Sequence, residues 1–367
     1  MRILHVYKAY YPVLGGIENH VRLLAEGQAA AGHEVTVLAT TSGARTQVES
    51  LGGVRVIKAG RLAEVASTPL SLSLPIHLVR QRPDITHLHF PYPPGELAQA
   101  LLLGARRTVL SYHSDVVRQK RLLKLYYPLM MRVLRRVDRI LVSSPPYLAS
   151  SATLAQVRER CTIIPYGIAQ ERFRRPAPGV EALRRALGPG PTVLFVGVLR
   201  YYKGLSYLLE AMRQVPARLV IVGEGPEGAA LREQTEALGL TGQVTFAGRI
   251  EDDALPAYYQ AADVFCLPAS ERSEAFGLVQ VEALSAGLPI VSTELGTGTS
   301  YVNQDGVSGL VVPTRNAGAL AHALGTLVQD AELRRRLAAG ARQRAEAFTA
   351  ERMLREIETV YGEVLAG

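Results

Sequence analysis

The sequence predicts an α/β protein made of two doubly wound domains. Short runs rich in Val, Ile and Leu alternate with amphipathic helical stretches along the whole chain, which is typical of parallel sheets covered on both faces. The alternation pauses over residues 169–191, which end in a cluster of prolines and glycines, and then restarts. A chain of 367 residues is also long enough for two hydrophobic cores.

The expected strands follow one another at spacings that leave room for helices. In an N-terminal domain of residues 1–170 they are Ile3–Tyr7, Glu34–Ala39, Ile85–Phe90, Thr108–Tyr112, Arg139–Ser143 and Thr162–Pro165. In a C-terminal domain of residues 171–349 they are Val193–Gly197, Arg218–Val222, Val244–Ala247, Val264–Leu267, Ile290–Ser292 and Leu310–Val312. Helices are expected at Ile17–Ala31, Leu122–Val137 and Pro226–Leu238, and a last one at about 350–365 either caps the second domain or crosses back to the first. Ligands of such sheets bind beyond the carboxyl ends of the strands.

The composition indicates an anionic partner and a reducing compartment. The 41 Lys and Arg residues against 33 Asp and Glu give a net charge of +8, most of it from arginine. The two cysteines, Cys161 and Cys266, lie in apolar runs, so we expect buried thiols. No apolar stretch reaches the roughly 18–20 residues of a membrane span, and the chain opens on a strand-like run rather than a signal peptide. We therefore expect a cytoplasmic protein, and no nucleic-acid partner, because no nucleic-acid-binding module accompanies the charge.

A glycine-rich turn, Gly223–Gly228, matches the dinucleotide fingerprint G-x-G-x-x-G. It follows an expected strand and opens an expected helix, and Glu251 lies near the position of a ribose-binding acid. The fingerprint normally follows the first strand of its domain, whereas this one follows the second. A nicotinamide cofactor is therefore one interpretation, and a turn beside another nucleotide is the favoured one.

The strongest constellation pairs two glutamates across the start of a helix. Glu274 precedes the expected helix Phe276–Ala286, and Glu282 lies about two turns inside it. At ~1.5 Å per residue the two carboxylates are very roughly 12 Å apart, a span that suits a sugar at one end and a ribose at the other. The backbone N–H groups of Gly277 and Leu278, at the positive end of the helix, suit a diphosphate between them.

With these residues the chain resembles the family 4 retaining glycosyltransferases, whose fold is GT-B, two Rossmann-like domains facing across a cleft. The most specific element of the resemblance is the E-x7-E motif Glu274–Glu282. Supporting motifs run from end to end in the family's order: Gly15–Glu18, Tyr112–Asp115, Ile164–Ile168, Phe195–Gly204, Gly223–Gly225 and Gly296–Val302. The resemblance makes the turn at Gly223 the family's second-strand turn, close to the donor nucleotide.

The resemblance implies roles for residues of the C-terminal domain. Glu274 would contact the transferred sugar and Glu282 the ribose, while Lys203 would stabilise the departing nucleoside diphosphate. The family usually has an arginine directly after the glycine of the strand that precedes this lysine. Here that position is Val198, and Arg200 is the residue that could reach the diphosphate instead.

In the N-terminal domain the resemblance points to Gly16 and His113. Gly16 would let the backbone approach the donor closely, and His113 would lie beside the reacting sugar and steady positive charge on its ring. His87 and His89 share one face of their strand, but no cysteine or acidic cluster completes a ligand set, so we expect no metal site. GT-B enzymes generally need no metal, so the nucleotide sugar is expected as a substrate without a further cofactor.

The stretch Arg118–Arg139 is dense in Arg and Lys among Leu, Met and Tyr. Such a basic amphipathic helix either covers the first sheet with a solvated face or contacts an anionic membrane surface. Pro128 is expected to kink or restart it. A lipid-linked acceptor at the inner membrane face would give peripheral membrane contact a use.

The expected activity is transfer of a hexose from a nucleotide-activated donor to a hydroxyl of a glycan or lipid-linked acceptor, with retention at the anomeric carbon. Ser111–Lys120 and Gly296–Val302 look most like bacterial mannosyltransferases of surface-polysaccharide assembly, which implies GDP-mannose. The alternatives are a UDP-sugar-dependent transferase of the same family, a nucleotide-sugar epimerase of the same fold, and an NAD-dependent oxidoreductase that uses Gly223–Gly228.

Overall fold

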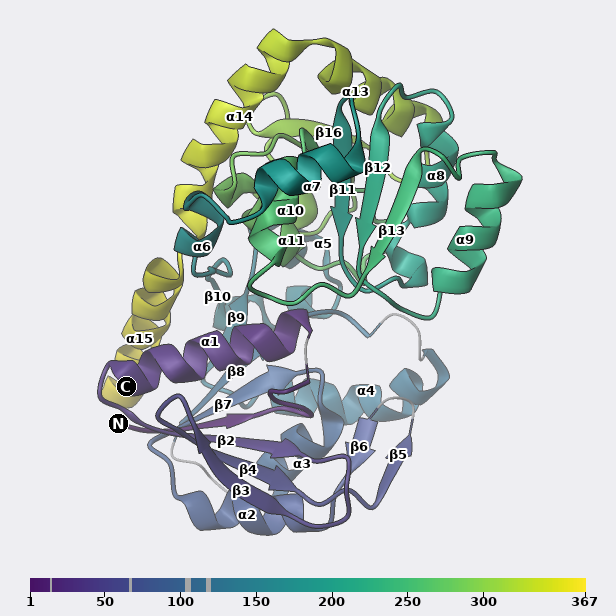
Figure 1. The fold of residues 1–367 in the computed structure, drawn as a ribbon. Coiled ribbons are helices and arrows are strands. Elements are labelled where there is room, and N and C mark those ends of the chain that lie inside the picture. Colours follow the sequence, from purple (N-terminus) through teal and green to yellow (C-terminus); the bar gives the residue numbers. More distant parts are fainter. Residues whose placement is uncertain (14, 66–67, 103–106, 117–119) are drawn as a thin grey trace. The chain divides into compact units, whose positions relative to one another are not determined.

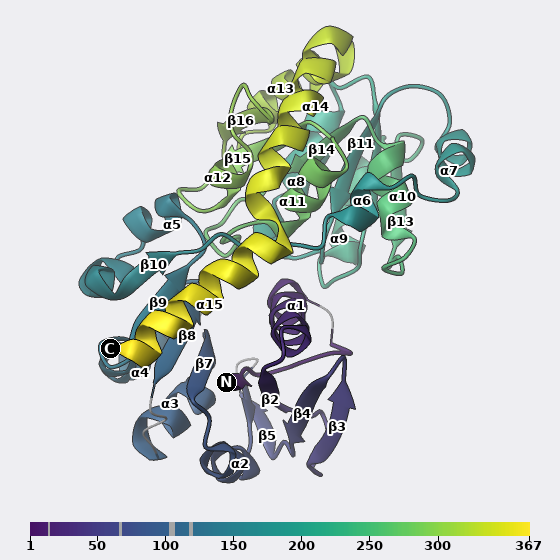
Figure 2. The ribbon, with the colours of Figure 1, turned by 90° about the vertical axis from the view of Figure 1, so that its left-hand side faces the viewer.

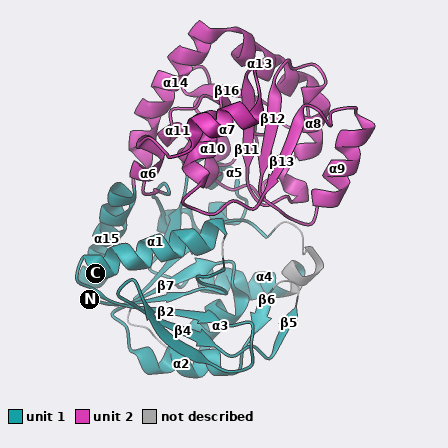
Figure 3. Ribbon diagram, in the orientation of Figure 1, with its two compact units in different colours: residues 1–166, 350–367 teal, residues 167–349 magenta. Residues whose placement is uncertain are grey.

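The computed structural model describes residues 1–13, 15–65, 68–102, 107–116 and 120–367 (Figure 1). These residues form two units, each with its own largely parallel sheet. The first unit consists of Met1–Tyr166 together with Ala350–Gly367, and the second of Gly167–Thr349 (Figure 3). The boundary expected between residues 170 and 171 lies just inside the second unit, and the C-terminal helix is part of the first.

Eight strands form the sheet of the first unit, in the order β10-β9-β8-β7-β1-β2-β4-β3. They are β1 (Arg2–Val6), β2 (Glu34–Thr40), β3 (Gln47–Leu51), β4 (Val54–Ala59), β7 (Ile85–Phe90), β8 (Thr108–Tyr112), β9 (Arg139–Val142) and β10 (Cys161–Ile163). All neighbours run parallel except β3 and β4, an edge hairpin that was not expected because β3 is polar and mostly exposed. A separate two-stranded ribbon, β5 (Ala63–Val65) with β6 (Thr68–Leu70), was also not expected.

Helices cover both faces of this sheet. In Figures 1 and 2, α1 (Gly16–Ala30) and α15 (Ala350–Ala366) lie over one face, and α2 (Ser73–Gln81) and α3 (Pro93–Leu102) over the other. The remaining helical elements are α4 (Lys120–Leu134), α5 (Pro145–Ser150) and the short 3-10 segment Leu154–Arg160. α15 packs closely on α1, because a Cβ atom at Gly27 would lie 2.6 Å from Leu354 Cδ1. The last helix therefore completes the core of the first unit.

The second unit has a six-stranded parallel sheet in the order β13-β12-β11-β14-β15-β16. Its strands are β11 (Thr192–Val196), β12 (Arg218–Val222), β13 (Val244–Gly248), β14 (Val264–Leu267), β15 (Ile290–Glu294) and β16 (Gly309–Pro313). Numbered within the unit this is the order 3-2-1-4-5-6 of a Rossmann sheet. Its helices are α6 (Glu171–Arg174), α7 (Val180–Leu187), α8 (Leu205–Met212), α9 (Gly228–Ala237), α10 (Leu255–Ala261), α11 (Leu278–Ser285), α12 (Thr299–Val302), α13 (Ala317–Gln329) and α14 (Ala331–Ala345), with 3-10 turns at Tyr201–Lys203 and Glu346–Phe348.

Three local expectations are corrected. The helix expected from Phe276 begins at Leu278, because Gly277 has φ 78° and lies outside the helical region. The helix expected from Pro226 begins at Gly228, after a turn. Cys266 is buried as expected, but Cys161 at the start of β10 is partly exposed.

The strand order fixes where the loops of the second unit meet. β11 and β14 are neighbours although β12 and β13 lie between them in sequence, so the chain reverses its winding direction at this pair. Loops that leave such a pair at their carboxyl ends diverge and leave a crevice, which is where open α/β sheets bind ligands. Lys203 follows β11 and Glu274 follows β14.

Candidate active site

Lys203 and Glu274 form an ion pair at this switch point. Lys203 Nζ lies 2.5 Å from Glu274 Oε2, and each side chain is only 10% exposed. The turn that carries Lys203 packs on the loop after β14: Ser270 donates its N–H to Tyr202 O at 2.8 Å, and a Cβ at Gly204 (φ 68°) would lie 2.0 Å from Pro268 O. Gly204 therefore permits the close approach that brings the two charged groups together.

The ion pair sets the charge of Lys203. Burial on its own lowers the pKa of a lysine, but the neighbouring Glu274 carboxylate more than offsets this, so the pKa of Lys203 stands above its ordinary value. The ammonium is thus a permanent positive charge in a site that excludes most water. The contact with Glu274 also fixes the position of the ammonium group.

The loop that carries Glu274 is held by the segment after β15. Thr297 donates its hydroxyl to Glu274 O at 2.8 Å, and Gly298 donates its N–H to Ala275 O at 2.7 Å. A Cβ at Gly298 would lie 2.7 Å from Phe276 Cδ2. The glycine- and threonine-rich motif Gly296–Val302 therefore has a physical task in this chain, which is to fix the backbone around Glu274.

Glu282 lies on α11 and is held by a residue that the sequence did not single out. Tyr259, fully buried on α10, donates its hydroxyl to Glu282 Oε2 at 2.6 Å. Burial raises the pKa of Glu282 to about 7, while the Tyr259 hydrogen bond and the charge of Arg172 act in the opposite direction. Tyr259 approaches from a different helix, so no spacing within the E-x7-E motif could have indicated it. Gly277 and Leu278 stand at the start of the same helix, as expected.

The fingerprint glycines pack on the turn that leads to Lys203. A Cβ at Gly223 (φ 126°) would lie 2.1 Å from Gly197 O, and one at Gly225 would lie 2.4 Å from Leu199 O. Leu199 also donates its N–H to Glu224 O at 3.0 Å. Both glycines are therefore explained by close backbone packing, without a nicotinamide cofactor. Arg200 lies on this turn with an exposed side chain.

In the first unit, His113 follows β8 and is 3% exposed. Its Nδ1 lies 2.6 Å from Tyr166 Oη and its Nε2 lies 3.0 Å from His89 Nδ1, so both ring nitrogens are hydrogen-bonded. Burial holds the pKa of His113 well below its ordinary value, which makes the ring neutral. Gly16 is the first residue of α1 and is exposed.

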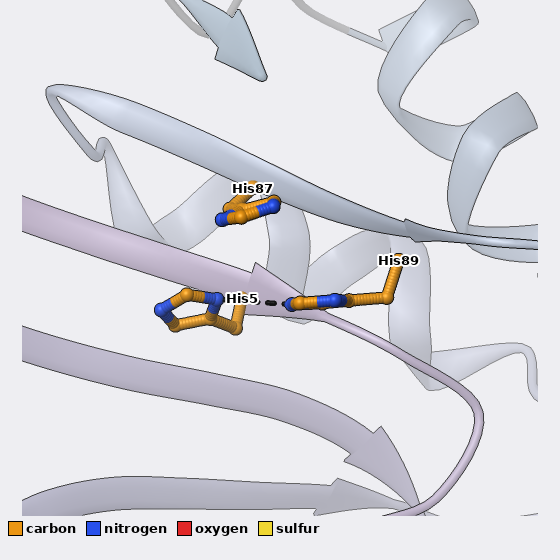
Figure 4. A group of neighbouring side chains, drawn as sticks. All are labelled: His5, His87 and His89. Carbon is orange, nitrogen blue, oxygen red and sulfur yellow. Dashed lines mark hydrogen bonds between the residues drawn. The ribbon is translucent and has the colours of Figure 1, made fainter. Parts of the chain in front are cut away.

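His113 belongs to a group of five buried histidines, which we call the histidine cluster: His5, His20, His87, His89 and His113. Ring nitrogens of His5, His87 and His89 lie within 4.8 Å of one another. The same is true of His20, His89 and His113. Figure 4 shows His5, His87 and His89 and the hydrogen bond between His5 and His89. The expectation of no metal site weighed only cysteines and acidic residues as further ligands beside His87 and His89, and it missed the other histidines that the fold brings to them.

The basic stretch uses its apolar side chains inside the first unit. Arg118 and Gln119 lie outside the described residues, and α4 continues through Pro128 instead of restarting there. Met130, Met131 and Leu134 are buried. Among the side chains of this stretch that the structure describes, the exposed ones are those of Lys124, Pro128, Arg132, Arg135 and Arg136. Within the described part of the chain, no helix has both the length and the apolar character needed to cross a bilayer.

Comparisons with known proteins agree along the whole chain. Residues 14–172 match the family model "Glycosyltransferase Family 4", and residues 183–344 match "Glycosyl transferases group 1". The O-antigen chain mannosyltransferase C of Escherichia coli is 38% identical over 369 aligned residues, which cover 100% of this chain and 99% of that one. The D-rhamnosyltransferase WbpZ of Pseudomonas aeruginosa is 41% identical over 328 residues, 88% of this chain and 86% of that one.

A solved structure shows the same fold. Anabaena HepE in complex with UDP-glucose superposes with a TM-score of 0.81 at 20% sequence identity, over 99% of this chain and 100% of that one. The two Rossmann-like units and these matches define a glycosyltransferase of the GT-B fold, so the predicted fold class is confirmed. The chain belongs to glycosyltransferase family 4. The oxidoreductase and epimerase alternatives are accordingly set aside.

Proposed function

We propose that this protein is a retaining glycosyltransferase that transfers mannose from GDP-mannose to a hydroxyl of a glycan or lipid-linked acceptor. The observation that carries the proposal is the contact between Lys203 and Glu274 at the switch point of the second unit. A donor needs a fixed cation for its leaving diphosphate and a carboxylate for the hydroxyls of its sugar. The ammonium of Lys203 and the carboxylate of Glu274 are in contact beyond the carboxyl ends of β11 and β14, where both are largely shielded from water.

The remaining donor contacts follow from the same unit. The N–H groups of Gly277 and Leu278 open α11 and offer donors to the diphosphate. Glu282 accepts hydrogen bonds from the ribose, with Oε2 already held by Tyr259. Arg200 is exposed beside Lys203 in sequence and supplies the second positive charge in place of the arginine missing at Val198. Gly223 takes part by shaping this turn.

The first unit supplies Gly16 and His113. His113 is neutral, so it does not repel the positive charge that develops on the sugar ring as the diphosphate departs. Departure of the leaving group and attack by the acceptor occur on the same face of the sugar, so no side chain is needed as a covalent nucleophile. Lys203 and Arg200 offer positive charge to the departing diphosphate, so transfer is proposed to be independent of a metal ion.

Mannose is supported by the relatives. One of them is named a mannosyltransferase and the other a D-rhamnosyltransferase, and D-rhamnose is 6-deoxy-D-mannose. Both names therefore point to a sugar with the axial 2-hydroxyl of mannose. The second candidate is a UDP-sugar-dependent transferase, which the complex of HepE with UDP-glucose favours.

Thermal unfolding in the presence of nucleotides tests the donor. GDP, UDP, ADP, GDP-mannose, GDP-D-rhamnose, UDP-glucose and NAD are each added with and without EDTA. A ligand at ~100 times its Kd adds about 2.7 kcal/mol, which raises Tm by roughly 5–10 °C if the second unit, Gly167–Thr349, unfolds by itself. A GDP-selective rise that is insensitive to EDTA is expected. A UDP-selective rise would replace GDP-mannose by the second candidate, and a rise that EDTA abolishes would refute metal independence.

We propose an electrostatic membrane contact that Lys124, Arg132, Arg135 and Arg136 make at the inner face of a cytoplasmic membrane. Met130, Met131 and Leu134 of the same stretch are buried within the first unit and are not available for insertion. Binding to vesicles that contain anionic lipid should therefore disappear as salt rises from about 50 to 500 mM. Binding that survives high salt would contradict this account.

A further inference from the structure

One buried amide gives a direction to a chain of hydrogen bonds in the first unit. Gln28 on α1 is fully buried, and its Oε1 lies 2.7 Å from His5 Nε2. An amide oxygen only accepts hydrogen bonds, so His5 must carry its proton on Nε2. The amide nitrogen of Gln28 is turned the other way and donates to Tyr361 Oη at 3.4 Å.

The proton position on His5 fixes which atom donates in each hydrogen bond that follows. Because His5 is neutral and protonated on Nε2, its Nδ1 is an acceptor, and His89 Nε2, 3.1 Å away, must donate to it. His89 Nδ1 is then an acceptor for His113 Nε2 at 3.0 Å. The chain ends where Tyr166 donates its hydroxyl to His113 Nδ1 at 2.6 Å. Every ring in this chain is therefore the Nε2–H tautomer.

The chain requires that all three rings be neutral. Burial lowers the pKa of His5 to about 4, and it holds those of His89 and His113 well below their ordinary value. A second proton on His5 or His89 would place two N–H groups against each other at a junction, and one on His113 would require the Tyr166 hydroxyl to turn and accept. The rings of His89 and His113 are nearly parallel, with an interplanar angle of 7°, whereas those of His5 and His89 make an angle of 30°.

His87 lies on a separate branch. Tyr361 donates its hydroxyl to His87 Nδ1 at 2.5 Å, and His87 Nε2 donates to Ser111 Oγ at 2.7 Å. This branch shares only Gln28 with the main chain. A strand register that pairs His5 with His87 and His89 with Ser111 keeps all four side chains on the sheet face that α1 and α15 cover.

We propose that Gln28, His5 and His89 are positioning residues that fix the tautomer and the ring plane of His113. The consequence for transfer rests on the proposed function, in which His113 stands beside the reacting sugar. A ring whose Nε2–H is committed to His89 and whose Nδ1 is committed to Tyr166 neither rotates nor gains a proton during the reaction. It presents the same neutral surface in every catalytic cycle.

The tautomers are measured directly by imidazole nitrogen shifts in protein labelled with ¹⁵N-histidine. The whole protein contains 8 histidines, so the signals of the spectrum are few enough to assign. We expect His5, His89 and His113 as Nε2–H tautomers at pH 7.5. Gln28→Leu removes the acceptor that begins the chain and should give mixed tautomers at all three rings, with kcat lower by about tenfold and a smaller change in the donor KM.

Two further variants keep the test decisive. Gln99→Leu makes the same replacement at another buried glutamine of the first unit, one that donates to Thr108, and should leave the histidine pattern and kcat unchanged. Gln28→Glu preserves a polar group at the critical position. At pH 9 its carboxylate accepts from His5 Nε2 as the amide does, so this variant should show the wild-type tautomers. It therefore still tests the proposal if the leucine variant unfolds.

Three results would overturn the proposal. The first is wild-type protein with Nδ1–H tautomers, and the second is an unchanged pattern in Gln28→Leu. The third is a His113 protonated on Nδ1 while its Nε2 and His89 Nδ1 both lack protons, the signature of a metal ion between them. The spectra need no substrate, so a failure of the proposed function would appear separately, as absent sugar transfer by wild-type protein with the expected tautomers.

Discussion

Replacing Lys203 by Met should destabilise the second unit strongly, because it leaves Glu274 without its counter-ion. Both side chains are 10% exposed, so the pair belongs with buried ion pairs rather than with surface ones. Breaking a buried pair from one side costs about 3–5 kcal/mol, whereas surface pairs are worth about 0.2–1 kcal/mol. For a unit of this size that corresponds to a fall in Tm of roughly 6–20 °C.

A double-mutant cycle separates the pair from the two side chains. Urea unfolding would be measured for wild type, Lys203→Met, Glu274→Gln and the double variant. Glu274→Gln should cost less than Lys203→Met, because the amide oxygen still accepts from the lysine. The double variant has no buried charge, so it should be more stable than the sum of the single losses predicts, with a coupling of about 2–3 kcal/mol.

Arg315→Met is the matched control. Arg315 pairs with Glu271, three residues before Glu274, but the two side chains are 53% and 32% exposed. Its loss should cost less than about 1 kcal/mol. If Lys203→Met costs no more than Arg315→Met, the pair does not behave as a buried one, and the reasoning about a protected cation and carboxylate fails.

The same variants test whether Lys203 acts on the diphosphate of the donor and Glu274 on its sugar. Glu274→Gln should retain nucleoside diphosphate binding while sugar transfer collapses, because the lysine remains. Lys203→Met should lose both. Isothermal titration with the nucleotide found by thermal unfolding measures the first quantity, and a transfer assay measures the second. Unchanged transfer by Glu274→Gln would refute the role proposed for this carboxylate.

Three further predictions follow from particular contacts. Tyr259→Phe removes the donor to Glu282 and should weaken nucleoside diphosphate binding about 3–10-fold in calorimetry, but should not change binding of an analogue without ribose hydroxyls. With the pKa of Glu282 near 7, nucleotide affinity should rise from pH 6 to pH 8 as the carboxylate ionises, and a flat profile would contradict this. The histidine cluster has depressed pKa values, so its stabilisation is present above pH 6.5 and lost below it. Between pH 7.5 and 5.5 each unfolded histidine takes up a proton that its buried ring does not, so the first unit loses stability, and buried Glu96, whose pKa is raised to about 7, offsets part of this loss by taking up a proton in the folded state. Urea unfolding at the two pH values should show the first unit markedly weaker at pH 5.5, and equal midpoints would refute the assignment.

The sequence was sufficient for features that depend on strand order. Lys203 and Glu274 are far apart along the chain, but each directly follows a strand of one Rossmann sheet, and the order of that sheet places those strands side by side. The sequence was therefore enough to predict that these two residues lie close together. The edge strand β3 was not, because an exposed polar strand has no apolar alternation to reveal it, whereas its buried partner β4, with Val54, Val56 and Ile57, carries apolar residues and was simply missed.

Amphipathic periodicity alone did not determine the partner of the apolar face of α4. The same pattern fits a helix on a membrane and a helix on its own sheet, and only burial separates the two. Met130, Met131 and Leu134 lie in the interior of the first unit. Lys124, Arg132, Arg135 and Arg136 are exposed, and their charge attracts an anionic surface but does not insert into it.

The histidine cluster shows why the rest of the site was not visible in the sequence. Its five rings come from β1, α1, β7 and the residue after β8, so no local spacing links them. Read singly, each histidine is an ordinary polar residue in an apolar strand or helix. Only in the folded sheet does the acceptor oxygen of Gln28 decide the protonation of His5, and through it that of two further rings. The property that matters for His113 is thus set by a residue 85 positions earlier, through hydrogen bonds whose direction follows from which atoms can donate.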